Sequence, residues 1–246
     1  MTIVLTPYMS CSAKIPIYSV FAAAFFPGYE ALAMIALYFG GMLVGVLAAL
    51  VMKSTAFRGK PIPFVMELPN YRFPAAKSVL LLMWEKAKDF LQRAFGIIFV
   101  ITILIWFLQN FDLRFNVVGD SGDSILASIG KFVAPVFAPL GFGEWEKVAA
   151  LVTGFTAKEA VVGTFGVLLG VSTDELTTAL HSLFDLRSAC SFLTFTLLYT
   201  PCVAAVATIR REMNSGWKTL GIVAMQCIIA WVAAWIVYLL GGILWA

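Results

Sequence analysis

Apolar stretches of roughly bilayer length alternate with polar connections along this chain. The six stretches have the approximate bounds 5–27, 31–52, 95–111, 146–170, 188–209 and 219–245. A membrane-spanning helix needs about 20 mainly apolar residues, so each stretch is a candidate span. The stretches 31–52 and 219–245 are uninterrupted and free of charged residues, whereas the first is interrupted by prolines, serines and Lys14. The pattern predicts an all-α fold, a polytopic transmembrane helical bundle.

The connection at 53–94 separates a first membrane region, 1–52, from a second, 95–246. Its basic residues are Lys53, Arg58, Lys60, Arg72, Lys77, Lys86, Lys88 and Arg93. Cytoplasmic connections carry such an excess of lysine and arginine, which places this one in the cytoplasm. One face of its second half is apolar at helical spacing, through Leu80, Met83, Trp84, Ala87, Leu91 and Ala94. This spacing predicts an interfacial amphipathic helix, and Pro61–Pro74 predicts an extended tether before it.

The distribution of basic residues between the connections does not fit six elements that each cross the membrane once. If 146–170 and 188–209 each crossed once, the basic cluster of Arg210, Arg211 and Lys218 would lie outside, against the positive-inside rule. Either one element is re-entrant or the apolar segment 125–142 crosses. We favour 146–170 as a broken or re-entrant gate element, because four glycines punctuate it. Non-helical backbone at membrane depth is tolerated where it lines a wet cavity, which is where transporters place substrate sites.

Composition strengthens the membrane prediction. Hydrophobic residues make up 61% of the 246 residues and charged residues 13%, and the mean hydropathy is +0.92. A soluble domain has about 25% charged residues, so this chain lacks the polar surface that a globule in water needs. The net charge of +3 is small and clustered, which indicates membrane orientation rather than nucleic-acid binding.

Enzyme classes find little support in the residue types. His181 is the only histidine and no Cys-x-x-Cys pair occurs. Cys190 and Cys227 follow no nearby proline, so we expect them to be packing residues. The chain lacks the P-loop pattern Gly-x-x-x-x-Gly-Lys-Ser/Thr, and no side-chain pair suggests a nucleophile with its base. We therefore expect neither catalysis nor a bound cofactor in this chain.

Lys158 and Glu159 lie inside an apolar stretch. A charge at the bilayer centre costs about 2.5–3.5 kcal/mol on insertion scales, and such residues usually mark ion or substrate paths. Neighbouring residues on a helix point about 100° apart, so each needs its own partner, water or unwound backbone. We expect a pore or gate element here. The alternative is that the span is shorter and both residues lie at its mouth.

Cys11 and Cys202 each follow a proline within a few residues inside an apolar run. Proline removes a helix hydrogen bond and frees a backbone carbonyl. A thiol, a free carbonyl and hydroxyls such as those of Ser10 and Ser12 suit a borderline-soft transition metal. The alternative is that both cysteines are small buried hydrophobes.

Five motifs follow one another along the chain. They are Met9-Ser-Cys-Ser-Ala-Lys-Ile-Pro-Ile-Tyr18, Phe64-Val-Met-Glu-Leu-Pro-Asn-Tyr-Arg-Phe-Pro74, Ala134-Pro-Val-Phe-Ala-Pro-Leu-Gly-Phe-Gly143, Gly154-Phe-Thr-Ala-Lys-Glu-Ala-Val-Val-Gly-Thr164, and Leu198-Tyr-Thr-Pro-Cys-Val-Ala204 with Ile209-Arg-Arg-Glu212. In this order they resemble the ferrous iron transport protein B (FeoB) family, over nearly the whole chain. The likeness is to the C-terminal membrane part of that family only.

The resemblance implies the membrane-pore portion of a ferrous iron (Fe²⁺) uptake transporter in the cytoplasmic (inner) membrane of a bacterium or archaeon. Family members also carry an N-terminal GTP-binding domain, to which GTPase activity is assigned. By the likeness, Cys11 and Cys202 match the cysteines proposed to line the iron path, and Lys158 and Glu159 match the second gate region. We expect the two cysteines to approach each other across a cavity near that gate. The implied partners are the lipid membrane, Fe²⁺ as the transported ion and the upstream GTP-binding half, with a homo-oligomer left open.

Two other functions compete with iron transport. A broken-helix transporter of an organic solute, such as a nucleoside, would need hydrogen-bonding side chains at mid-membrane, and Glu159 is one of few there. A truncated fragment that does not transport would fold only with a partner chain. The three hypotheses share the fold, and only the first two need a path through the membrane.

Overall fold

The computed structural model describes residues 5, 8–55, 75–112, 114–118, 121–172, 175–199 and 202–244. Its elements are η2 Ser12–Lys14, α2 Ile15–Phe25, α3 Glu30–Thr55, α4 Ala76–Asn110, η3 Ser121–Asp123, α5 Ile125–Phe137, η4 Ala138–Leu140, α6 Trp145–Thr156, α7 Ala160–Leu169, α8 Leu176–Leu183, α9 Leu186–Leu198, α10 Val203–Met213 and α11 Gly216–Leu244. Within those ranges the β-structure is limited to one isolated bridge, between Phe111 and Val117. The predicted all-α fold is confirmed.

Two helices, α3 and α11, are long and apolar enough to cross a membrane. Their candidate spans, Glu30–Ser54 and Gly216–Ile243, overlap the predicted stretches 31–52 and 219–245. Only 17% of the most apolar part of each span is buried inside the protein. Most of both helices therefore presents apolar side chains outward, as contact with lipid requires.

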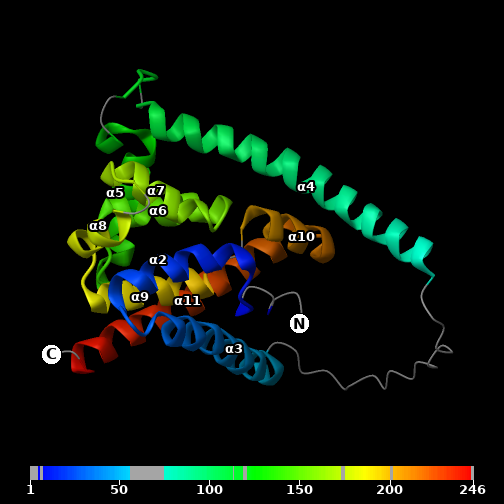
Figure 1. Cartoon of the computed structure of the whole chain (residues 1–246), viewed down its shortest axis with the longest axis horizontal. Helices are drawn as coiled ribbons and strands as arrows, with labels where there is room; N and C mark the ends of the chain where they lie inside the picture. The colour runs from blue at the N-terminus through cyan, green and yellow to red at the C-terminus, as the bar shows by residue number, and fades with distance from the viewer. Residues whose placement is uncertain are drawn as a thin grey trace.

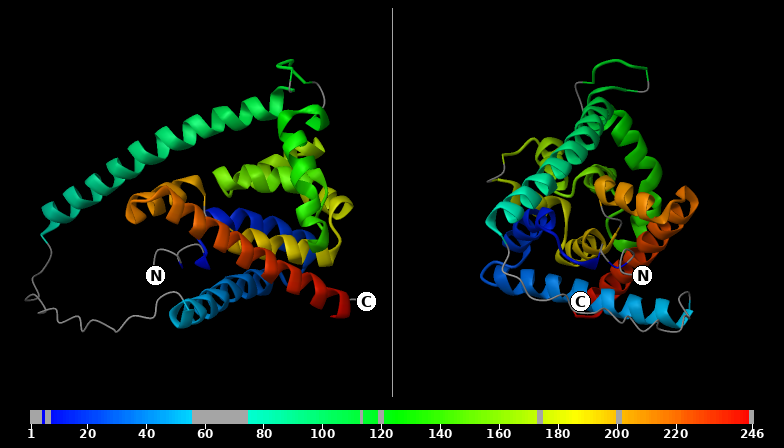
Figure 2. Two further views of the ribbon diagram at one scale, coloured as in Figure 1. Left: turned by 180° about the vertical axis from the view of Figure 1, so that it is seen from behind. Right: turned by 90° about the vertical axis from the view of Figure 1, so that its right-hand side faces the viewer.

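The predicted interfacial helix and the predicted span at 95–111 form one continuous helix, α4. We had expected a surface helix that ends before the span begins. The described side chains at 75–88 are all exposed, including Leu80 and Trp84. Helix α4 packs against α5, α6 and α10, and it lies on the opposite side of the molecule from α3 (Figures 1 and 2). The predicted tether at Pro61–Pro74 lies outside the described residues.

Two of the predicted stretches are each made of two helices. The stretch at 146–170 is broken, as predicted: α6 ends at Thr156 and α7 begins at Ala160. The stretch at 188–209 is broken between α9 and α10, which the sequence analysis did not anticipate. Pro201 explains this second break, because the residue before a proline is disfavoured in the α conformation and helices usually end there.

The segment 125–142 forms α5 and η4 and then turns into α6. Ile125–Leu140 and Trp145–Thr156 meet at an angle of 103°, which describes either a broken span or a re-entrant loop. Two glycines permit this turn. Gly141 has φ +80°, and a Cβ at Gly130 would lie 2.9 Å from the carbonyl oxygen of Trp145. Because these atoms are so close, α5 and α6 can cross at this point only without a side chain at Gly130.

Helix α9 runs through the middle of the bundle, between α2 and α11 (Figure 1). It begins at a capping box in which Asp185 and Ser188 bond each other's backbone amides. Its Phe192 ring packs against Phe21 at 5.5 Å, Phe142 at 5.5 Å and Phe184 at 5.0 Å between ring centroids. This aromatic core fixes α9 in position, and with it the place where α9 ends.

Candidate functional site

Two buried lysines meet the carboxyl end of α9. Lys14 is 4% exposed and donates from Nζ to the carbonyl oxygen of Leu197 at 2.8 Å and of Met9 at 3.3 Å. Lys158 is 2% exposed and donates to the carbonyl oxygen of Thr196 at 3.3 Å. The last four carbonyls of a helix have no partner within it and form its partially negative end. Side chains from η2 and from the α6–α7 break thus cap the same helix terminus.

The break between α6 and α7 sends its two charged residues in different directions. Ala157 leaves the helix with extended backbone, and residues 158–159 form a turn before α7. Lys158 turns inward, with its Nζ 3.0 Å from the ring centroid of Tyr199, whereas Glu159 is exposed. This agrees with the expectation that adjacent charges need separate surroundings.

Both predicted cysteines lie at starts of helices beside this cluster. Cys11 is the N-cap of η2 and is exposed, and Cys202 is the N-cap of α10 and is partly buried. Each interacts electrostatically with Lys14 and with Lys158. Residues far apart in the sequence therefore lie around the end of α9. They come from three places where helical structure is interrupted: the η2 turn, the α6–α7 break and the α9–α10 break.

Ser10 and Ser12 lie with Cys11 in a pocket of about 370 Å³. The pocket separates the cysteine motif from α3 and is lined by Ser10, Cys11, Ser12, Ile15, Tyr18, Met34, Ile35, Tyr38 and Phe39. The Ser10 hydroxyl lies 3.5 Å from the Tyr18 hydroxyl. An ion in this pocket would meet one thiol and several hydroxyl groups.

The sequence analysis missed three contributors to this cluster. Lys14 was noted only as an interruption of an apolar run, and Cys227 was expected to be a packing residue. Cys227 interacts electrostatically with Lys158 and with Tyr199. The hydroxyl of Thr196 is buried without a hydrogen-bond partner among the described residues, which is rare enough in proteins to suggest a functional role. A lysine beside a cysteine motif in an apolar run was the available signal for Lys14.

No preformed metal cage accompanies these groups: the described residues hold no cluster of three or more histidine, cysteine, aspartate or glutamate side chains. An ion passing here would instead be bound by thiols, backbone carbonyls and hydroxyls. Such a mixed set suits transit, since conduction needs binding that is weak enough to release the ion.

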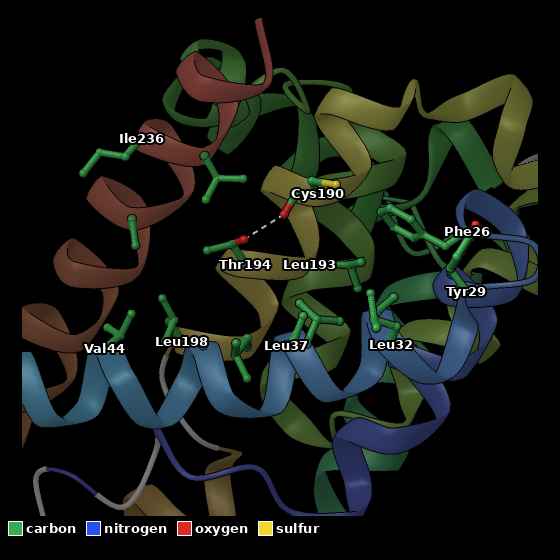
Figure 3. A pocket seen from close by; sticks show the side chains of 16 residues that line it. Phe26, Tyr29, Leu32, Leu37, Val44, Cys190, Leu193, Thr194, Leu198 and Ile236 are labelled. Carbon is green, nitrogen blue, oxygen red and sulfur yellow. Dashed lines mark hydrogen bonds between the residues drawn. The ribbon is translucent and has the colours of Figure 1, made fainter. Parts of the chain in front are cut away.

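A second, larger pocket of about 550 Å³ lies between α3, α9 and α11 (Figure 3). Its lining is almost wholly apolar, with Leu32, Leu37 and Leu198 among the side chains that point into it. The Thr194 hydroxyl there is already bonded to the Cys190 carbonyl at 2.8 Å (Figure 3). This pocket offers an ion no charged ligand, so the candidate path is the lysine and cysteine cluster.

Two protein families match the chain. Residues 91–216 match the Gate family, described as "Nucleoside recognition", and residues 34–86 match the family "Ferrous iron transport protein B C terminus". No solved structure matches.

Similar curated proteins are Fe²⁺ transporters. The chain is 35% identical to "Fe(2+) transporter FeoB" of Methanocaldococcus jannaschii, covering 99% of this chain and 37% of that protein. It is 36% identical to the protein of the same name from Staphylococcus aureus strain COL, covering 98% and 36%. A fusion of Fe²⁺ transport protein A and FeoB from Porphyromonas gingivalis is 33% identical, covering 98% and 34%. The chain thus spans about a third of the length of these relatives.

Proposed function

Because this chain belongs to the ferrous iron transport protein B family and matches its C-terminal membrane part, we propose that it forms the membrane-pore portion of an Fe²⁺ importer. The observation that carries this proposal is the meeting of both cysteine motifs with Lys14 and Lys158 at the end of α9. Uptake would be driven by a GTP-binding domain encoded upstream, and the pore would lie in a cytoplasmic (inner) membrane.

The geometry supports transit of a partly dehydrated divalent cation. Fe²⁺ entering an apolar bundle must exchange its water for protein ligands, and imidazole, thiolate and carbonyl groups are those that suit it. The path offers thiols at Cys11 and Cys202, and carbonyls at the interrupted end of α9. Interrupted helices are also where transporters hold their coupled ions.

The printed description of the Gate family makes nucleoside transport the second candidate. A nucleoside needs several directed hydrogen bonds from a pocket of its own size, because polar groups left unpaired on binding cost free energy. The 550 Å³ pocket is large enough, yet its threonine hydroxyl is already bonded and its lining is apolar. The smaller pocket at Cys11 offers hydroxyls and a thiol. The chemistry of the two pockets therefore favours the metal ion.

The test is anaerobic uptake of Fe²⁺ into membrane vesicles that hold this chain with any upstream segment that its gene encodes. The variant replaces Cys11→Ser and Cys202→Ser together, and the matched control is Cys190→Ser, a cysteine lining the apolar pocket. We expect uptake to collapse in the double variant and to continue in the control. Normal uptake by the folded double variant would remove both thiols from the path.

A parallel assay with a radiolabelled nucleoside separates the two candidates. Vesicles that accumulate the nucleoside and exclude Fe²⁺ would reverse the assignment. Vesicles that accumulate neither would leave the chain with a role in assembly alone. The double cysteine variant should not alter nucleoside uptake in any case, since a serine hydroxyl preserves hydrogen bonding where a thiol is only a weak donor.

A further inference from the structure

The two buried lysines donate hydrogen bonds to backbone carbonyl oxygens that could otherwise bind a passing cation. Lys14 Nζ lies 2.8 Å from the Leu197 oxygen, and Lys158 Nζ lies 3.3 Å from the Thr196 oxygen. These are consecutive carbonyls in the last turn of α9, which ends at Leu198. A helix carboxyl end attracts cations because its carbonyl dipoles point outward. Each lysine amine fills the coordination position that its carbonyl would give to a metal ion.

The lysines come from elements that are themselves interruptions of helical structure. Lys14 ends the short η2 turn after Cys11, and Lys158 lies in the turn between α6 and α7. Turns of this kind change backbone angles at a lower cost than a helix interior does. Neither lysine belongs to α9, so withdrawal of either amine breaks its hydrogen bonds to carbonyl oxygens and leaves the contacts of α9 around Phe192 in place.

A second observation at the same place points to a ligand. The Thr196 hydroxyl is fully buried and makes no hydrogen bond among the described residues, although its own carbonyl accepts from Lys158. Leaving a buried hydroxyl unsatisfied costs about 1–3 kcal/mol. The residue whose carbonyl Lys158 holds thus also carries an oxygen atom without a partner among the described residues, and a hydroxyl oxygen can serve as a metal ligand.

On this geometry we propose that Lys14 and Lys158 are positioning residues that close the ion path, holding the carbonyls of Leu197 and Thr196 until a divalent cation displaces the amines. The inference rests on the proposed function and adds a gate to it. In the resting protein the amines cover the carbonyls and deny ions a site. Entry of Fe²⁺ moves the amines aside, and departure of the ion lets them return, so the path does not stay open.

Lys147 provides a matched control. It is buried to the same degree as Lys158, at 2% exposed, and belongs to the adjoining helix α6. Its amine, however, forms an ion pair with Glu144 and lies 4.6 Å from the Phe184 ring centroid, away from the end of α9. Removing its amine changes a buried lysine without touching the carbonyls in question.

The first experiment measures binding of radiolabelled Fe²⁺ by anaerobic equilibrium dialysis, on the chain with any upstream segment its gene encodes, in lipid nanodiscs. We expect Lys14→Met and Lys158→Met each to bind Fe²⁺ roughly tenfold more tightly than wild type, because one hydrogen bond from lysine no longer has to be broken. Lys147→Met should bind as wild type does. Lys158→Arg, which keeps donors at the carbonyl, should restore the wild-type affinity. Unchanged or weaker binding in the folded methionine variants overturns the proposal.

A measurement on the wild-type protein covers the case in which those variants do not fold. Amine acylation followed by mass spectrometry should show that Fe²⁺ increases the reactivity of Lys14 and Lys158 and leaves Lys147 unchanged. Reactivity that does not respond to Fe²⁺ overturns the gate. The vesicle uptake assay described above distinguishes failure of the gate from failure of the transport function. Normal Fe²⁺ uptake with unresponsive lysines refutes the gate alone. Absent uptake together with absent binding refutes the transport function as well.

Discussion

The two ends of α6 each place a lysine in the interior, and they stabilise it in opposite ways. Lys147 lies in the first turn, where the helix dipole disfavours a cation, and it is paired with Glu144 just outside the helix. Lys158 lies between α6 and α7, and its amine donates to a carbonyl at the carboxyl end of α9, where the helix dipole favours a cation. One lysine is balanced by a carboxylate and the other by backbone carbonyls and a tyrosine ring.

This difference separates a structural lysine from an exchangeable one. Breaking the ion pair between a lysine and its carboxylate is unfavourable, because it leaves a buried charge without a partner. A row of carbonyl oxygens accepts any cation of suitable size, so a metal ion can replace the amine with little loss. Equal burial, at 2% for both side chains, therefore hides unequal roles.

The largest effect on stability is expected from breaking the carboxylate pair. Glu144→Gln leaves Lys147 buried without a counter-charge, which costs about 3–5 kcal/mol when both partners are buried. Glu144 is 57% exposed, so screening reduces the expected loss to about 2 kcal/mol. Thermal unfolding in detergent measures it. A midpoint equal to wild type would mean that Lys147 reaches another acceptor, and its balance would then resemble that of Lys158.

A comparable effect should come from crowding the Lys158 end of α6. A Cβ at Gly154 would lie 2.4 Å from Val161 Cγ2 and 2.8 Å from the Tyr199 hydroxyl, which donates to the Leu151 carbonyl. Valine is stiff about χ1 and cannot easily turn away. Gly154→Ala should therefore destabilise the protein by about 1–3 kcal/mol and displace the tyrosine ring on which the Lys158 amine rests.

Gly163→Ala is the matched control for that substitution. Gly163 lies in α7, and no atom lies within 4 Å of the position its Cβ would take. Alanine is favoured over glycine in a helix interior by about 1 kcal/mol, so this variant should unfold at the wild-type temperature or above it. If both alanine variants unfold alike, the packing at Gly154 is looser than the described contacts require.

The same contrast explains what the sequence could predict. Long apolar runs and the positive-inside rule were enough for the helical class and for α3 and α11, because burial in lipid depends on composition and length. The glycines and charges of 146–170 were enough to predict its break. Nothing local shows, however, that Lys14 reaches the carbonyl of Leu197, a partner 183 positions away. The sequence offers Lys147 a carboxylate three positions before it, whereas only packing brings Lys158 to the end of a helix 38 positions away.

The smallest effect is expected at the second charge of the α6–α7 break. Glu159 is exposed although it adjoins the most buried lysine of the cluster. If its carboxylate does not balance Lys158, Glu159→Gln should change the free energy of unfolding by no more than about 0.5 kcal/mol, as for ordinary surface substitutions. It should also leave Fe²⁺ affinity within about twofold of wild type. We expect Fe²⁺ uptake to fall, because an exposed carboxylate attracts the cation toward the path. A loss of stability comparable to that of Glu144→Gln would show that Lys158 relies on a carboxylate after all, and the distinction between the two ends of α6 would then fail.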